Sequence, residues 1–161
     1  MRRTKEEAEQ TRQDLLEAAL SIFSRASFAS ARLEDIAAAA GVTRGAIYHH
    51  FGGKAELFLA LVEDASAQGG TVIQAAIAEG GDFAAITRRI LERSLRLLEE
   101  NRRFRETMAL TLFQSGGSPE LAPFVAQVRE QARTQVEELA GLFQVGIEAG
   151  ALREDLAPET M

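Results

Sequence analysis

The sequence lacks several features that define large classes of proteins. It contains no cysteine, which argues against a disulfide framework and against catalysis by a thiolate. Proline occurs only three times in 161 residues, as expected for a chain made mainly of helices. No apolar run of about 18 residues occurs, and the N-terminus carries no apolar segment. The sequence therefore predicts neither a membrane span nor a secretory signal, and it indicates a cytoplasmic protein.

Motifs of the common enzyme classes are also absent. The sequence contains no GxSxG, HExxH, Walker A or GxGxxG arrangement. Its only two histidines, His49 and His50, are adjacent and would point about 100° apart on a helix, which does not suit a shared metal ion. The acidic pairs at 99–100 and 137–138 are typical of solvated helix surfaces. We therefore expect no enzymatic activity, no cofactor and no metal site.

Charge is divided unevenly along the chain. Eighteen Lys and Arg and 24 Asp and Glu give a net charge of −6. Residues 1–54 hold eight basic and seven acidic residues, a balance of +1, so residues 55–161 hold the other ten and seventeen, a balance of −7. An acidic second part does not forbid DNA binding by the first, because electrostatic fields decay within about 8–10 Å at ordinary salt. The net charge does argue against a protein that coats DNA regardless of sequence.

Apolar residues recur at helical spacing, and no alternating strand pattern occurs, so the sequence predicts an all-α fold. A capping box at Thr4 and Glu7 predicts the start of a first helix that ends near Ala26. Gly69 and Gly70 are candidates for a break or a bend after the fourth helix. The remaining helices are expected over 33–39, 44–50, 54–67, 82–99, 102–114 and 119–149.

Residues 33–51, LEDIAAAAGVTRGAIYHHF, predict two short helices joined at Gly41, where glycine tolerates a positive φ. We expect the hydroxyl of Thr43 to cap the second helix. In a DNA-binding helix-turn-helix, the second helix enters the major groove with its N-terminal residues at base edges. Thr43, Arg44 and Gly45 would occupy that position here. The alternative is a buried helical hairpin whose polar residues are merely solvated.

Several segments carry a family resemblance: RTKEEA at 3–8, TRQ at 11–13, AALSIF at 18–23, DIA at 35–37, AGVTRGAIYHHF at 40–51 and KAEL at 54–57. Through them the chain resembles the TetR family of bacterial transcriptional regulators, and within it the AcrR-like repressors of multidrug efflux. The resemblance covers residues 3–60 and continues more weakly through 102–113 and the last long helix. It implies a three-helix DNA-binding domain at 1–53 and a helical ligand-binding and dimerisation domain at 54–161.

What the resemblance implies about function is a homodimer that represses transcription from a palindromic operator in double-stranded DNA. A small hydrophobic effector in the second domain would change the spacing of the two DNA-binding heads and release the operator, and an efflux system would be the controlled target. The chain ends where the family adds two further helices, so the second domain is expected to be shortened. The alternative is a helical ligand-binding or interaction protein that has lost operator recognition.

The family pattern places Arg44, Gly45 and Tyr48 at bases or the nearby DNA backbone, and His49 at a variable position of the recognition helix. The residue types agree with this assignment, because an arginine there can fork onto the O6 and N7 atoms of guanine. Tyr48 could instead be a half-buried spacer.

The same pattern places Thr43, His50 and Lys54 mainly at phosphates. His50 could equally be an interior histidine bonded to backbone, and Lys54 a solvated lysine. The chain departs from the family at Ser27, where glycine is usual, and before the second helix, where a hydroxyl residue is usual. Arg32 is the candidate for the phosphate contact that this hydroxyl would make.

An effector site is expected on the predicted helix 102–114. Its apolar stripe mixes aromatic, aliphatic and methionine side chains, as adaptable pockets do. An apolar stripe at this spacing is nonetheless more often core than pocket. The candidate residues are Phe104, Met108, Leu112 and Phe113.

Overall fold

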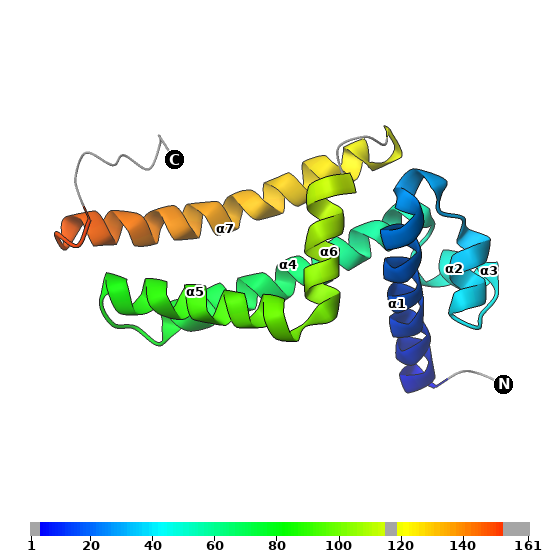
Figure 1. Ribbon diagram of the computed structural model, residues 1–161, viewed down its shortest axis with the longest axis horizontal. Helices are drawn as coiled ribbons and strands as arrows, with labels where there is room; N and C mark the ends of the chain where they lie inside the picture. Colours follow the sequence, from blue (N-terminus) through cyan, green and yellow to red (C-terminus); the bar gives the residue numbers. More distant parts are fainter. Residues whose placement is uncertain (1–3, 115–118, 153–161) are drawn as a thin grey trace.

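The computed structural model describes residues 4–114 and 119–152, and this part of the chain forms seven α-helices, one 3-10 helix and no strand (Figure 1). The predicted all-α fold is therefore confirmed. None of the helices in these ranges is both long and apolar enough to cross a bilayer. The elements are α1 Lys5–Ser30, α2 Leu33–Ala39, α3 Arg44–His50, α4 Lys54–Ala78, α5 Phe83–Glu100, α6 Arg102–Gln114, η1 Pro119–Leu121 and α7 Ala122–Glu148.

Helix α1 begins at the predicted capping box. The Thr4 hydroxyl accepts a hydrogen bond from the Glu7 amide at 3.2 Å, and the Glu7 carboxylate accepts one from the Thr4 amide at 3.0 Å. The first helical segment stops at Ala26, as expected, because Ser27 has a φ of 61° and a ψ of 161°, which are not helical. A further helical turn follows to Ser30, so α1 is kinked at Ser27. The kink directs Phe28, which is 1% exposed, into the core.

Helices α2 and α3 have the bounds that the sequence predicts. Gly41, between them, adopts a φ of 66°, which explains why glycine is needed there. The Val42 amide closes the turn by donating to the Ala37 carbonyl at 3.0 Å. One expectation was wrong: Thr43 occupies the N-cap position of α3, but its side chain makes no capping hydrogen bond.

The core of the N-terminal head, which comprises α1, α2 and α3, also includes the first turns of α4. Phe23 and Phe28 of α1 pack with Phe58 of α4, and the three ring centroids lie 5.4–5.6 Å apart. Burial of each such ring contributes about 1.5–3 kcal/mol. Ile36 of α2 and Ile47 of α3 are fully buried in the same cluster. Helix α4 therefore belongs to the head as well as to the body, and the division at 53/54 stays a prediction.

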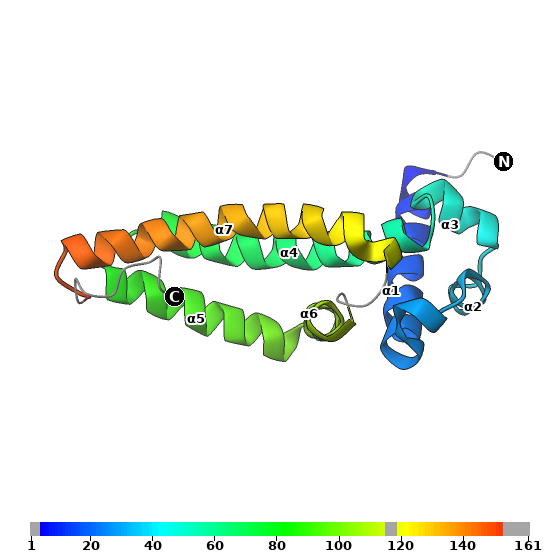
Figure 2. The same ribbon diagram turned by 90° about the horizontal axis from the view of Figure 1, so that it is seen from above.

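The body is an elongated arrangement in which α4, α5 and α7 run lengthwise and α6 crosses them beside α1 (Figures 1 and 2). Helix α4 was expected to end near Ala67, but it runs to Ala78 without a break at Gly69. A Cβ atom at Gly69 would lie 3.8 Å from the Phe104 ring of α6. That distance is ordinary van der Waals contact, so packing does not require glycine at this position. Contact with α6 instead supports the helix that the glycines weaken.

Candidate nucleic-acid interface

Helix α3 lies at the end of the molecule away from α5 (Figures 1 and 2). Ile47 is fully buried and anchors this short helix to the head. Five of the predicted DNA-binding residues, on α3 or at its N-cap, are exposed. They are Thr43, Arg44, Gly45, Tyr48 and His49. Exposure of the polar side of α3 suits contact with DNA, and it fits equally the alternative of a helical hairpin with solvated polar residues.

Arg44 is held in a defined position by two neighbours. Its Nη1 donates to Oε1 of Glu34, on α2, at 2.6 Å, and its Nη2 donates to the hydroxyl oxygen of Tyr48 at 2.7 Å. The guanidinium also lies 5.4 Å from the centroid of the Tyr48 ring, a cation–π distance. The hydrogen bond to Tyr48, and then the negative charge of Glu34, raise the pKa of Arg44. Arg44 therefore presents a permanent, oriented positive charge at the start of α3.

Glu34 belongs to the candidate interface, although no sequence motif singles it out. A hydrogen bond from its own backbone amide, in the first turn of α2, is the largest influence lowering its pKa, and the charges of Arg44 and Arg32 add to it. Arg32, at the N-cap of α2, lies 3.9 Å from the Glu34 carboxylate and is 71% exposed at its side chain. The structure thus gathers Arg32 and Arg44 around one carboxylate. Arg32 and Glu34 are neighbours at the start of α2, whereas the crossing of α2 and α3 brings Arg44 to Glu34.

Gly45 is not required by the packing of the protein itself. A Cβ atom at this position would meet only the Thr43 hydroxyl, at 3.7 Å, which is ordinary van der Waals contact. A glycine within a helix costs up to about 1 kcal/mol relative to alanine. A bare backbone on an exposed helix start therefore suits close approach by another molecule.

The two histidines differ in environment. His49 is exposed, whereas His50 is half-buried with its ring 6.3 Å from that of Phe51. Their own ring centroids are 5.2 Å apart. Within the described residues, no group of three or more His, Asp or Glu is placed to hold a metal ion.

Lys54 lies against the end of α1 rather than in open solvent. Its side chain is 20% exposed, and its Nζ donates to the carbonyls of Ala31 at 3.3 Å and Ala29 at 3.4 Å. The same atom lies 4.6 Å from the Phe28 ring centroid. A lysine at carbonyls near a helix C-terminus is favourably placed. The alternative of a simply solvated lysine is therefore wrong.

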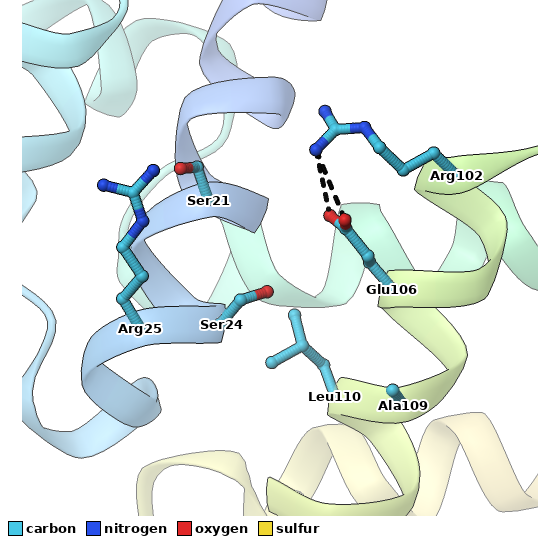
Figure 3. Close-up of a pocket in the computed structure, with 7 residues that line it drawn as sticks. All are labelled: Ser21, Ser24, Arg25, Arg102, Glu106, Ala109 and Leu110. Carbon is cyan, nitrogen blue, oxygen red and sulfur yellow. Dashed lines mark hydrogen bonds and ion pairs between the residues drawn. The ribbon is translucent and has the colours of Figure 1, made fainter.

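The four candidate effector residues do not share one environment. Phe104 is buried and Met108 half-buried, but Leu112 is 78% exposed, and the side chain of Phe113 lies outside the described residues. The spacing predicted one common face, and this expectation was wrong for Leu112. A cleft of about 420 Å³ instead lies at another face of α6, against α1 (Figure 3). It is lined by Ser21, Ser24, Arg25, Arg102, Glu106, Ala109 and Leu110.

A helix-turn-helix head with an exposed second helix, joined to an all-helical body, defines the class of helix-turn-helix regulatory proteins. The family described as "Bacterial regulatory proteins, tetR family" matches residues 15–61. The repressor BepR of Brucella suis is 30% identical over 161 residues, which cover 99% of this chain and 77% of BepR. The chain belongs to the TetR family, as the sequence predicted.

Similarity to other members is strongest in the head. TtgR of Pseudomonas putida is 56% identical over 63 residues, which cover 39% of this chain but only 30% of TtgR. The crystal structure of NalD, described as the secondary repressor of the MexAB-OprM multidrug efflux pump in Pseudomonas aeruginosa, matches with a TM-score of 0.75 and 27% identity. That match covers 93% of this chain and 76% of NalD.

Proposed function

We propose that this protein is a sequence-specific transcriptional regulator that represses from a palindromic operator as a homodimer and is released by a small hydrophobic effector. The observation that carries the proposal is the exposed surface of α3, with Arg44 held at its start by two hydrogen bonds. BepR and NalD are both named as repressors, which supports a repressor role for this protein. NalD is named as a repressor of an efflux pump, which supports control of an efflux system. A cytoplasmic location follows from this role.

On this proposal, α3 enters the major groove with its N-terminal end foremost. Arg44 reads guanine, and Tyr48 contacts the same stretch of DNA from the next turn of the helix. Gly45 lets the helix backbone approach the DNA closely. His49 lies on the same exposed side and is available to either base or backbone.

Phosphate contacts would surround this reading helix and fix its orientation. The Thr43 hydroxyl makes no capping bond, so it can donate to a phosphate oxygen. Arg32 projects from the start of α2, and His50 ends α3. Lys54 reaches a phosphate by exchanging its contacts with the carbonyls of Ala29 and Ala31.

DNA selection from a random pool, followed by footprinting of the recovered sequence, tests operator binding. Arg44→Ala is expected to relax the preference at one base position by about 1–3 kcal/mol. Lys54→Ala is expected to weaken binding to all sequences alike and to lower the salt slope by about 0.9. Arg88→Ala is the matched control, because Arg88 is an exposed arginine on α5 in the body. A wild-type protein with no preferred sequence would favour the alternative of a helical binding protein without operator recognition.

The effector and the dimer need separate measurements. A panel of hydrophobic efflux substrates should raise the thermal midpoint of the protein, because a ligand that binds only the folded state stabilises it. The same compounds should weaken operator binding. Sedimentation of the protein, alone and with operator DNA, gives the number of chains in each species. A panel that leaves both the midpoint and operator binding unchanged contradicts the effector part of the proposal.

A further inference from the structure

Glu34 interacts with two arginines of the head, Arg44 at the start of α3 and Arg32 at the N-cap of α2. Its carboxylate accepts a hydrogen bond from Arg44 at 2.6 Å and lies 3.9 Å from Arg32. Glu34 is exposed and lies on α2, whereas Arg44 begins α3. The pair therefore links the two helices of the helix-turn-helix at its solvent side.

The hydrogen bonds of Arg44 leave part of its guanidinium available. A guanidinium has five N–H donors, and each terminal nitrogen carries two. Glu34 and Tyr48 take one donor each, from Nη1 and Nη2 respectively. One donor on each terminal nitrogen and the Nε donor remain, enough for a fork onto guanine while both protein contacts persist.

We infer that Glu34 is a positioning residue for sequence readout: it holds the Arg44 guanidinium at the base edge and away from the phosphates. This inference rests on the proposed function. An arginine side chain has about 2 kcal/mol of rotamer entropy to lose when it is fixed, and a guanidinium already held by Glu34 loses less of it at a guanine. On DNA of the wrong sequence, the carboxylate keeps Arg44 from folding back onto a phosphate. Both effects favour the operator over other DNA.

Glu34→Gln tests the inference with little change of shape. Specific and competitor DNA affinities are measured across a salt series, and the ratio of the two is expected to fall about two- to fivefold, the range given by an exposed ion pair. Affinity for competitor DNA should rise, with a salt slope steeper by up to about 0.9, as one more phosphate contact forms. DNA selection should show a relaxed preference only at the base position that Arg44→Ala also relaxes.

Asp35→Asn is the matched control. Asp35 is the next residue in the same first turn of α2, it is exposed, and the substitution removes the same charge. Because Asp35 makes no ion pair in the described part of the chain, Asp35→Asn should leave the ratio of affinities unchanged. A second test combines Glu34→Gln with Arg44→Ala, where Glu34→Gln should no longer alter the ratio.

The outcomes separate this inference from the proposed function. Equal ratios for Glu34→Gln and Asp35→Asn, with a selective wild-type protein, would overturn the inference alone. An effect of Glu34→Gln that persists without Arg44 would also overturn it, because Glu34 would then act by another route. A wild-type protein that prefers no DNA sequence would overturn both.

Discussion

Replacement of Ser27 by glycine should stabilise the protein. Ser27 is the one non-glycine residue in the described ranges with a positive φ, at 61°, and its ψ of 161° places it in a region occupied almost only by glycine. The strained conformation lets α1 kink so that Phe28 enters the core between Phe23 and Phe58. The surrounding packing therefore imposes the strain, and removal of the Cβ atom should relieve it.

The expected gain can be bounded from this geometry. Such a backbone conformation costs a non-glycine residue about 1–3 kcal/mol. Glycine itself lowers the stability by about 0.5–1 kcal/mol, because it gives the unfolded chain more conformational freedom. This cost is subtracted from the relieved strain. The side chain of Ser27 is exposed, and its contact with the Ser30 hydroxyl, at 3.5 Å, is long, so its loss costs little. The net gain should be about 0–2.5 kcal/mol, or up to about 10 °C in thermal midpoint for a chain of this length.

Thermal and urea unfolding of three variants check this reasoning. Ser27→Gly should unfold later than the wild type and bind operator DNA unchanged. Ser27→Ala keeps the Cβ atom and should show no gain. Ser30→Gly, in the last turn of α1, should be neutral or destabilising, because its backbone has no positive φ. An equal gain for Ser27→Ala, or a loss for Ser27→Gly, would refute the argument from backbone strain.

Three further substitutions test other parts of the structure. Thr4→Ala should cost about 0.5–2 kcal/mol in urea unfolding, because it removes the hydroxyl of the capping box; an unchanged midpoint would show that the start of α1 contributes nothing. Gly45→Ala should keep or raise stability by up to about 1 kcal/mol while operator affinity falls in a gel-shift titration; unchanged affinity would contradict close backbone approach. Hydrogen bonds from Arg93 and then Arg89 lower the pKa of Glu79 from its ordinary value, so its contribution to stability is present above the ordinary pKa and is lost as the pH falls through the lowered pKa. Glu79→Gln should therefore be less stable than wild type at neutral pH, and thermal scans should show the difference closing in acid.

Several helix boundaries could be predicted closely because local chemistry marks them. The capping box at Thr4, the positive φ at Gly41 and the cap at Asp82, whose carboxylate accepts from the Ala85 amide at 2.8 Å, each act within a few residues. The end of α4 could not be predicted in this way. Gly69 weakens a helix locally, but its contact with Phe104 comes from α6, 35 residues later in the chain, and packing at that distance decides the outcome.

The same distinction between local pattern and tertiary contacts applies to the candidate site. The motif predicts which residues of α3 are exposed, because helical spacing and the buried Ile47 determine its outer face. The partners of the charged side chains could not be predicted. Glu34 meets Arg44 because α2 and α3 cross at a particular angle, and Lys54 meets the carbonyls of Ala29 and Ala31 because α1 kinks. Such contacts depend on tertiary geometry that no sequence spacing specifies.

These contacts bear on how a chain of net charge −6 would bind DNA. Arg44 is already paired with a carboxylate, and Lys54 with two carbonyl oxygens. On the proposed function, DNA that draws on these cations must replace or accommodate partners that the protein supplies, so the gain from phosphates is smaller than a count of positive charges suggests. Affinity then depends more on contacts that only the right sequence offers, above all at Arg44. On the proposed function, a head whose cations are held in this way should have weak general attraction to DNA, and its selectivity should follow from that weakness.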